Sequence, residues 1–179
     1  MVSRPRQRFR HTKKTVLIVG EGPTEKAFLQ YLKDMYITRE MDIAVKIECG
    51  SGGSPKSVVE KAVRLRGNRA YDKCFVLVDA DLPFDPDGEL ERRMRKKPRI
   101  EMLNATPCIE GLLLTILDSN FPQQATTSVE SKRIFETKHL PEDKKTDKSS
   151  YERIFSKQVI EKRREGVLEL DAVLKAMEV

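Results

Sequence analysis

The chain has 179 residues, of which 39% are hydrophobic and 35% charged, which fits one domain of about 100–200 residues with a buried core. Its formal net charge of +6 and pI of about 9.2 favour polyanionic partners in general, although a basic soluble protein without such a partner is an equally good interpretation. Three widely spaced cysteines without a CxxC pair argue against a disulfide framework or a zinc site, and no apolar run reaches the roughly 18 residues of a membrane span, so we expect a cytoplasmic protein with buried thiols.

The first half of the chain predicts two strand–helix units after a basic arm. Residues 1–14 are basic and lack the apolar core of a signal peptide, which predicts a flexible arm. Residues 15–20 form a continuous apolar run, typical of a strand covered on both faces. A turn at 21–25 leads into a helix opened by Pro23. Residues 44–49 alternate between apolar and polar, which predicts a strand at or near a sheet edge, and Pro55 opens the next helix.

The second half begins with another fully apolar run, Lys73–Asp79, which predicts a central strand. A charged helix over 87–97, a short strand over 99–103 and a helix opening at Thr106-Pro107 follow. The domain therefore spans residues 15–121. Residues 122–150 are polar and predict a loop or linker. Residues 151–179 are helical in pattern, interrupted at Gly166, and predict an extension that packs on the domain.

The alternation of strands and helices predicts an α/β fold with an open, mainly parallel, Rossmann-like sheet of about four strands flanked by helices. We expect the two fully apolar strands to be neighbours in the centre and the alternating strand to lie outside them. This gives the strand order 2-1-3-4. Ligands of such sheets bind at the carboxyl ends of the strands, where the order reverses.

Four carboxylates follow the two predicted central strands: Glu21, Glu25, Asp79 and Asp81. Crowded carboxylates raise one another's pKa unless a cation neutralises them. Mg²⁺ does this in combination with substrate phosphates, and Mn²⁺ is an alternative. We therefore predict a divalent metal site, in which one carboxylate acts as a general base or proton shuttle.

Each acidic motif also has a structural explanation. A glutamate in the first helical turn complements the helix dipole, and Asp79-Ala-Asp81 is ordinary turn chemistry. For either motif alone the structural explanation is favoured. Together, at adjacent strand ends, they favour a metal site. The first turn is not a P-loop, since GxxxxGK[ST] is not matched.

Three segments together resemble the RloB-like proteins, relatives of the Toprim (topoisomerase–primase) domains and the OLD-type nucleases. Val16–Glu25 resembles the first family motif, Val78–Asp81 its Asp-x-Asp motif, and Asn104–Leu114 its Pro-Cys-Phe-Glu segment. The resemblance covers roughly residues 15–120. It implies a Toprim-like fold and a Mg²⁺-dependent activity.

The resemblance also implies a role for each acidic residue. Glu21 is a catalytic acid/base or a metal contact, and Asp79 and Asp81 are metal ligands. Glu110 joins the catalytic site from the last helix, and Glu25 is a supporting catalytic carboxylate. Such proteins are associated with phage defence or abortive infection, often beside an ATPase partner.

Two functional hypotheses follow from the sequence. The first is a metal-dependent nuclease that holds DNA or RNA with the basic residues of the charged helix, although a solvated helix face is the commoner explanation of such charges. These residues are Arg92, Arg93, Arg95, Lys96 and Lys97. The alternative is a catalytically weak, Toprim-like nucleic-acid-binding or partner module that works with an ATPase. It is motivated by Ile109, Leu112 and Ile116, which stand where family members often have Phe, Trp and His, and by an amphipathic C-terminal segment. The apolar positions of that segment, for which packing on the domain's own core is the commoner explanation, are Val159, Leu168, Leu170 and Leu174.

Overall fold

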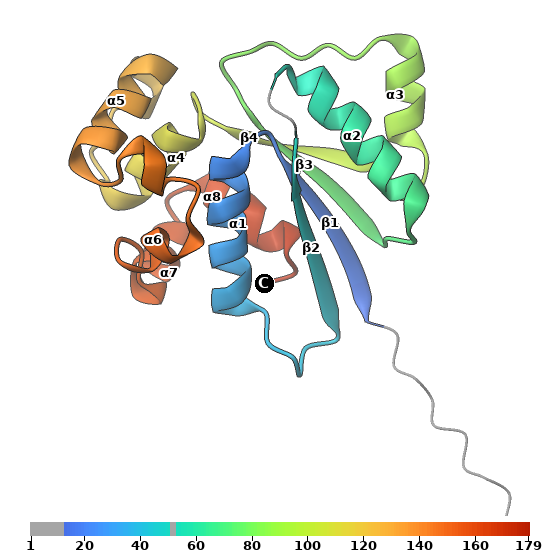
Figure 1. Ribbon diagram of the computed structural model, residues 1–179, viewed down its shortest axis with the longest axis horizontal. Coiled ribbons are helices and arrows are strands. Elements are labelled where there is room, and N and C mark those ends of the chain that lie inside the picture. The colour runs from blue at the N-terminus through green and yellow to red at the C-terminus, as the bar shows by residue number, and fades with distance from the viewer. Residues whose placement is uncertain (1–12, 51–52) are drawn as a thin grey trace, which may run out of the picture.

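The computed structural model describes residues 13–50 and 53–179. Within them a four-stranded, all-parallel sheet has the strand order β2-β1-β3-β4, which confirms the predicted order (Figure 1). The strands are β1 (Lys14–Gly20), β2 (Ile43–Cys49), β3 (Lys73–Asp79) and β4 (Ile100–Ala105). The predicted basic arm, residues 1–14, lies outside the described residues except for Lys13 and Lys14.

Helices cover both faces of the sheet (Figure 1). The first four helices alternate with the strands and are α1 (Pro23–Tyr36), α2 (Pro55–Asn68), α3 (Gly88–Arg95) and α4 (Ile109–Leu117). The others follow as η1 (Gln123–Ala125), α5 (Ser128–Lys138), η2 (Glu142–Lys144), α6 (Lys148–Glu152), α7 (Lys157–Arg164) and α8 (Leu168–Ala176). Among the described residues, no helix is long and apolar enough to cross a membrane.

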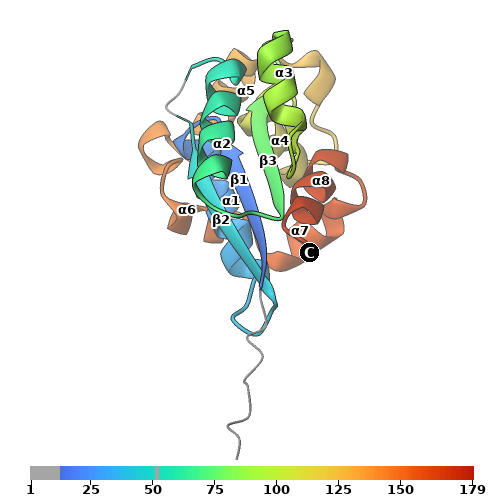
Figure 2. The same ribbon diagram turned by 90° about the vertical axis from the view of Figure 1, so that its right-hand side faces the viewer.

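The alternation of side chains along each strand divides the core in two. In β1, Val16 and Ile18 pack into the cluster beneath α1 and the C-terminal helices, whereas Leu17 and Val19 pack beneath α2 and α3. All four side chains are fully buried, as expected for a strand covered on both faces. Figure 2 shows α2 and α3 next to each other over their face of the sheet.

The edge strand β2 differs in the expected way. Val45 and Ile47 are buried, while Lys46 between them is exposed. A charged residue on an edge strand discourages pairing with another chain. The strand is therefore dry on one face and wet on the other, and the prediction from alternation is confirmed.

The interpretation of residues 122–150 as a polar loop or linker needs correction, because this segment contains α5, η2 and part of α6. Thr127 caps α5: its hydroxyl accepts the Glu130 N–H at 3.2 Å, and the Glu130 carboxylate accepts the Thr127 N–H at 3.0 Å. Phe135 is fully buried against the core. Single buried side chains on an otherwise polar helix leave little periodicity in the sequence.

The C-terminal helices are held on the domain by an aromatic cluster. The Phe28 ring on α1 lies 5.7 Å from the ring of Tyr151 and 5.7 Å from that of Phe155, measured between centroids. All three side chains are fully buried. Aromatic pairs at this spacing contribute roughly 0.5–1.5 kcal/mol beyond their buried area. The extension is therefore part of the main core.

Candidate functional site

The turn after β1 positions Glu21 and Glu25. Gly20 ends the strand, and a Cβ atom there would lie 2.7 Å from the Glu25 Cβ, so only glycine permits this close approach. The Gly22 N–H donates to the Glu25 carboxylate at 2.8 Å. Glu25 therefore stabilises the start of α1, as the structural explanation of a first-turn glutamate requires. Glu21 is half-buried and accepts the Asp79 N–H at 3.2 Å.

The last residue of β1, Gly20, pairs with Leu77, so β3 continues for two residues after β1 has ended. Asp79 therefore lies beyond the end of β1, next to the turn that carries Glu21. Asp79 is buried, and its Oδ1 accepts the Ile109 N–H at the start of α4 at 2.9 Å. Asp81 is exposed and accepts a hydrogen bond from the Ser128 hydroxyl of α5. The Asp79-Ala-Asp81 motif is thus divided between the interior and the surface.

Glu110, in the first turn of α4, is almost fully buried. Its Oε1 accepts a hydrogen bond from the Lys145 ammonium at 2.8 Å, and the same ammonium lies 2.6 Å from a carboxylate oxygen of Glu136 on α5. The other carboxylate oxygen, Oε2, is buried without a hydrogen-bond partner in the described structure. A buried oxygen of this kind costs free energy unless a ligand, water or ion satisfies it.

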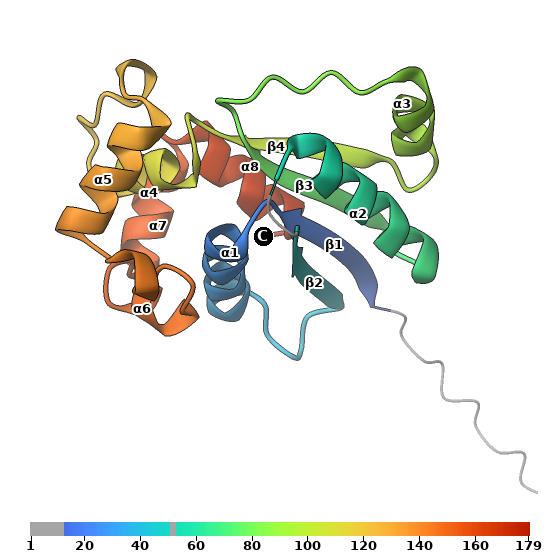
Figure 3. The ribbon, with the colours of Figure 1, turned by 45° about the horizontal axis from the view of Figure 1, so that its top comes forward.

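These side chains surround a pocket of about 300 Å³ at the carboxyl ends of β1 and β3, which we call the carboxylate pocket. Its charged side chains are six carboxylates and two lysines: Glu21, Glu25, Asp79, Glu110, Glu136, Glu142, Lys132 and Lys145. Asp81 is not among the lining residues. Figure 3 shows α4, α5 and α6 grouped around this end of the molecule.

Burial and mutual repulsion make the acidic groups resist ionisation. Desolvation, with the nearby charges of Glu25 and Glu21, raises the pKa of Asp79 to about 8. Desolvation is also the main cause of the raised pKa values of Glu21 and Glu25, with Asp81 adding to the first and Glu110 to the second. A cation in the pocket would reverse this effect on each pKa.

The same surroundings favour the charged form of the two lysines. Partial desolvation disfavours the charged form of Lys132, but the nearby acidic groups, Glu110 and Asp79 foremost, together outweigh it and raise the pKa. For Lys145, hydrogen bonds to Glu110 and Glu136 outweigh desolvation and raise the pKa. Both lysines therefore carry positive charge into an acidic pocket. Even so, within the described ranges no three His, Cys, Asp or Glu side chains are arranged to hold a metal ion.

The basic helix α3 lies away from this pocket, at the opposite end of the molecule from α5 (Figure 3). Two of its arginines form ion pairs within the helix, Arg92 with Glu89 and Arg95 with Glu91. The carbonyls at its carboxyl end accept hydrogen bonds from Arg66 of α2. The remaining predicted phosphate-binding residues there are Arg93, Lys96 and Lys97, of which the two lysines are exposed.

Sequence reasoning missed the contribution of α5 and η2 to the site. Lys132, Glu136 and Lys145 all fall in the segment interpreted as a loop or linker. One signal was present in the sequence: Thr127 followed three residues later by Glu130 is a capping-box pattern that marks a helix start. Nothing in the sequence pairs Lys145 with Glu110, because their contact depends on tertiary packing.

Comparison with known proteins identifies the family. No curated protein and no solved structure gave a significant match. A family model described as RloB-like protein matches residues 16–177, which include all the described strands and helices except the first two residues of β1. The chain therefore belongs to the RloB-like family.

Proposed function

We propose that the carboxylate pocket binds Mg²⁺ and hydrolyses nucleic-acid phosphodiesters, as a Toprim-related nuclease would. The observation that carries this proposal is the convergence of Glu21, Asp79 and Glu110 on one pocket from the ends of two strands and the start of a helix. Hard oxygen ligands at the carboxyl edge of a parallel sheet suit a divalent cation and a phosphate.

The pocket fits such a cation in two respects. Glu110 offers a buried oxygen that lacks a partner within the described residues, and Asp79 has a pKa raised by burial and, in addition, by two neighbouring glutamates. No described trio is already placed to hold an ion, so binding must rearrange side chains. The ligands proposed from the sequence are Glu21, Asp79 and Asp81, and Asp81 would have to leave Ser128 to take part.

When bound, Mg²⁺, or Mn²⁺ in its place, would supply positive charge to the carboxylates and to a phosphodiester oxygen. Glu21 has the position of a general acid/base, because it is half-buried, borders the pocket and has a raised pKa. Lys145 holds the Glu110 carboxylate, and Glu136 in turn holds the Lys145 ammonium. Lys132 brings a further positive charge to the pocket for an incoming phosphate.

A second candidate function is a catalytically weak Toprim-like module that binds nucleic acid or serves an ATPase partner, as in phage defence or abortive infection. One contact favours it: the Lys145 ammonium already neutralises Glu110 from within the chain. A side chain that acts as a permanent counter-ion reduces the need for a metal.

Cleavage assays distinguish the two candidates. We expect the chain to cut DNA or RNA when Mg²⁺ or Mn²⁺ is present, and Asp79→Asn to reduce the rate by about a hundredfold or more, as loss of an essential group does. Asp85→Asn removes the same charge from an exposed loop residue and should leave the rate unchanged. No metal-dependent cleavage by the wild type, or equal cleavage by Asp79→Asn, would rule out the nuclease.

A further inference from the structure

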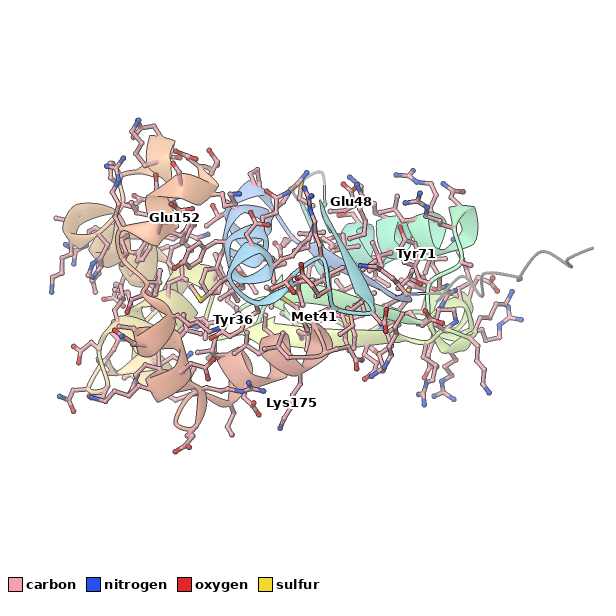
Figure 4. All side chains as sticks on the ribbon, turned by 90° about the horizontal axis from the view of Figure 1, so that it is seen from below. Tyr36, Met41, Glu48, Tyr71, Glu152 and Lys175 are labelled. Atoms are coloured by element: carbon pink, nitrogen blue, oxygen red, sulfur yellow. The ribbon has the colours of Figure 1, made fainter. Side chains whose placement is uncertain are left out.

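A second pocket lies at the opposite end of the sheet, where the strands begin. It has a volume of about 610 Å³ and is formed by the end of α1, the start of β2 and the loop before β3. We call it the basic groove. Figure 4 views this end from below, with Met41 in the loop between α1 and β2 and Tyr71 in the loop between α2 and β3.

The charged side chains of the basic groove are all positive: Lys13, Lys33, Arg39, Lys46 and Arg69. Lys13 is used structurally, since its ammonium donates to the Arg39 and Met41 carbonyls at 2.8 and 2.9 Å. Lys46 pairs with Glu48 at 2.9 Å. Lys33, Arg39 and Arg69 form no side-chain hydrogen bond or ion pair with any residue that the structure describes. Three cations are thus available to a ligand.

Apolar surface lies among these charges. Ile37 and Ile43 are half-buried at the groove, Val45 is buried beneath them, and the half-buried ring of Tyr71 lies on its border. A ligand that matches both parts carries negative charge and a flat apolar face. A nucleotide unit of a single strand has this chemistry: the phosphate meets lysine and arginine, and the base lies against apolar or aromatic groups.

The basic groove differs from the basic helix α3 in how its cations are paired. On α3, Arg92 and Arg95 are paired with glutamates of the same helix, so phosphates would compete with those carboxylates. No carboxylate is among the described residues that line the groove, and of its five cations only Lys46 is paired with a described carboxylate, that of Glu48. A phosphate at the groove therefore competes with fewer carboxylates than one on α3, where both of these arginines are paired with glutamates.

We infer that the basic groove binds single-stranded nucleic acid, with Lys33, Arg39 and Arg69 holding the phosphates. This rests on the proposed function, because it assigns the place where a flanking part of the substrate is held. The groove and the carboxylate pocket lie at opposite ends of β1, whose seven residues span roughly 20 Å. The groove thus contributes to affinity while the carboxylate pocket carries the chemistry.

The test measures the binding of fluorescently labelled single-stranded DNA and RNA by fluorescence anisotropy. EDTA is present to remove divalent metal, so that no cleavage occurs. The groove variant is Lys33→Gln/Arg39→Gln/Arg69→Gln. The matched control, Arg92→Gln/Arg95→Gln/Lys97→Gln, removes the same charge from α3 and its carboxyl end. We expect the groove variant to bind at least about tenfold more weakly, with a salt dependence shallower by about two units of slope, because each lost phosphate contact removes about 0.7.

Two results would overturn the inference: equal affinity of the groove variant and the wild type, or an equal loss in the α3 control. Failure of the proposed function gives a different pattern. If the groove variant binds weakly but no form of the chain cleaves with metal, the groove stands and the nuclease does not. If the chain cleaves with metal and the groove variant binds normally, the nuclease stands and the groove does not.

Discussion

Glu110 and Lys145 form the most buried ion pair of the described site, with side-chain exposures of 3% and 8%. Such a pair adds little net stability as a whole, yet removing one partner leaves the other charge uncompensated. We predict that Lys145→Met lowers the free energy of unfolding by roughly 3–5 kcal/mol. The double variant Lys145→Met/Glu110→Gln should lose clearly less. Urea unfolding of both variants measures this, and a double variant less stable than Lys145→Met would contradict it.

Asp79 should make the stability of the fold depend on pH. Its pKa is about 8 in the folded chain, against an ordinary value of 3.8. Between these values the unfolded chain holds fewer protons at this group, so stability falls as the pH rises through this range. The substituted side chain of Asp79→Asn cannot ionise. The free energy of unfolding of Asp79→Asn, relative to that of the wild type, should therefore rise by at least about 1 kcal/mol between pH 5 and pH 8. Urea unfolding at a series of pH values measures this. If the free energy of unfolding changes with pH in the same way for both proteins, the Asp79 carboxyl is not held neutral.

At the scale of elements, α5 was the least predictable part of the site and brings Lys132 and Glu136 to it. Its start depends on the capping box between Thr127 and Glu130. We predict that Thr127→Ala lowers the free energy of unfolding by about 1 kcal/mol, the usual cost of a lost cap. Val129→Ala, at an exposed position on the same helix, should change it by less than about 0.5 kcal/mol. Equal effects of the two substitutions on denaturant unfolding would argue against the cap.

Strands were easier to predict than the later helices, for a physical reason. The apolar runs of β1 and β3 indicate burial on both faces, and the alternation in β2 indicates an edge. The two apolar runs and the alternating strand together predicted the strand order of the sheet. In α5, burial falls on Ser131 and Phe135, which is too few apolar positions for a helical period to emerge.

For the whole molecule, three of the four carboxylates predicted to meet at one sheet edge, Glu21, Glu25 and Asp79, line the carboxylate pocket, together with Glu110, which only the family resemblance had implied. The prediction held for these three because the carboxyl ends of neighbouring parallel strands share an edge. The lysines that balance these carboxylates could not be predicted, since Lys132 and Lys145 reach the pocket only through packing of the C-terminal helices. The contact of Asp81 with Ser128 of α5 likewise depends on that packing.

Calorimetric titration of Mg²⁺ into the wild type and Glu21→Gln tests the central claim most directly. Glu21→Gln keeps the size of the side chain while removing its charge from the pocket, and the exposed Glu165→Gln is the matched control. We predict saturable binding to the wild type and to Glu165→Gln, and binding at least about tenfold weaker in Glu21→Gln, which corresponds to about 1.4 kcal/mol. A wild type that gives no binding heat, or three identical isotherms, would contradict a metal site in the carboxylate pocket.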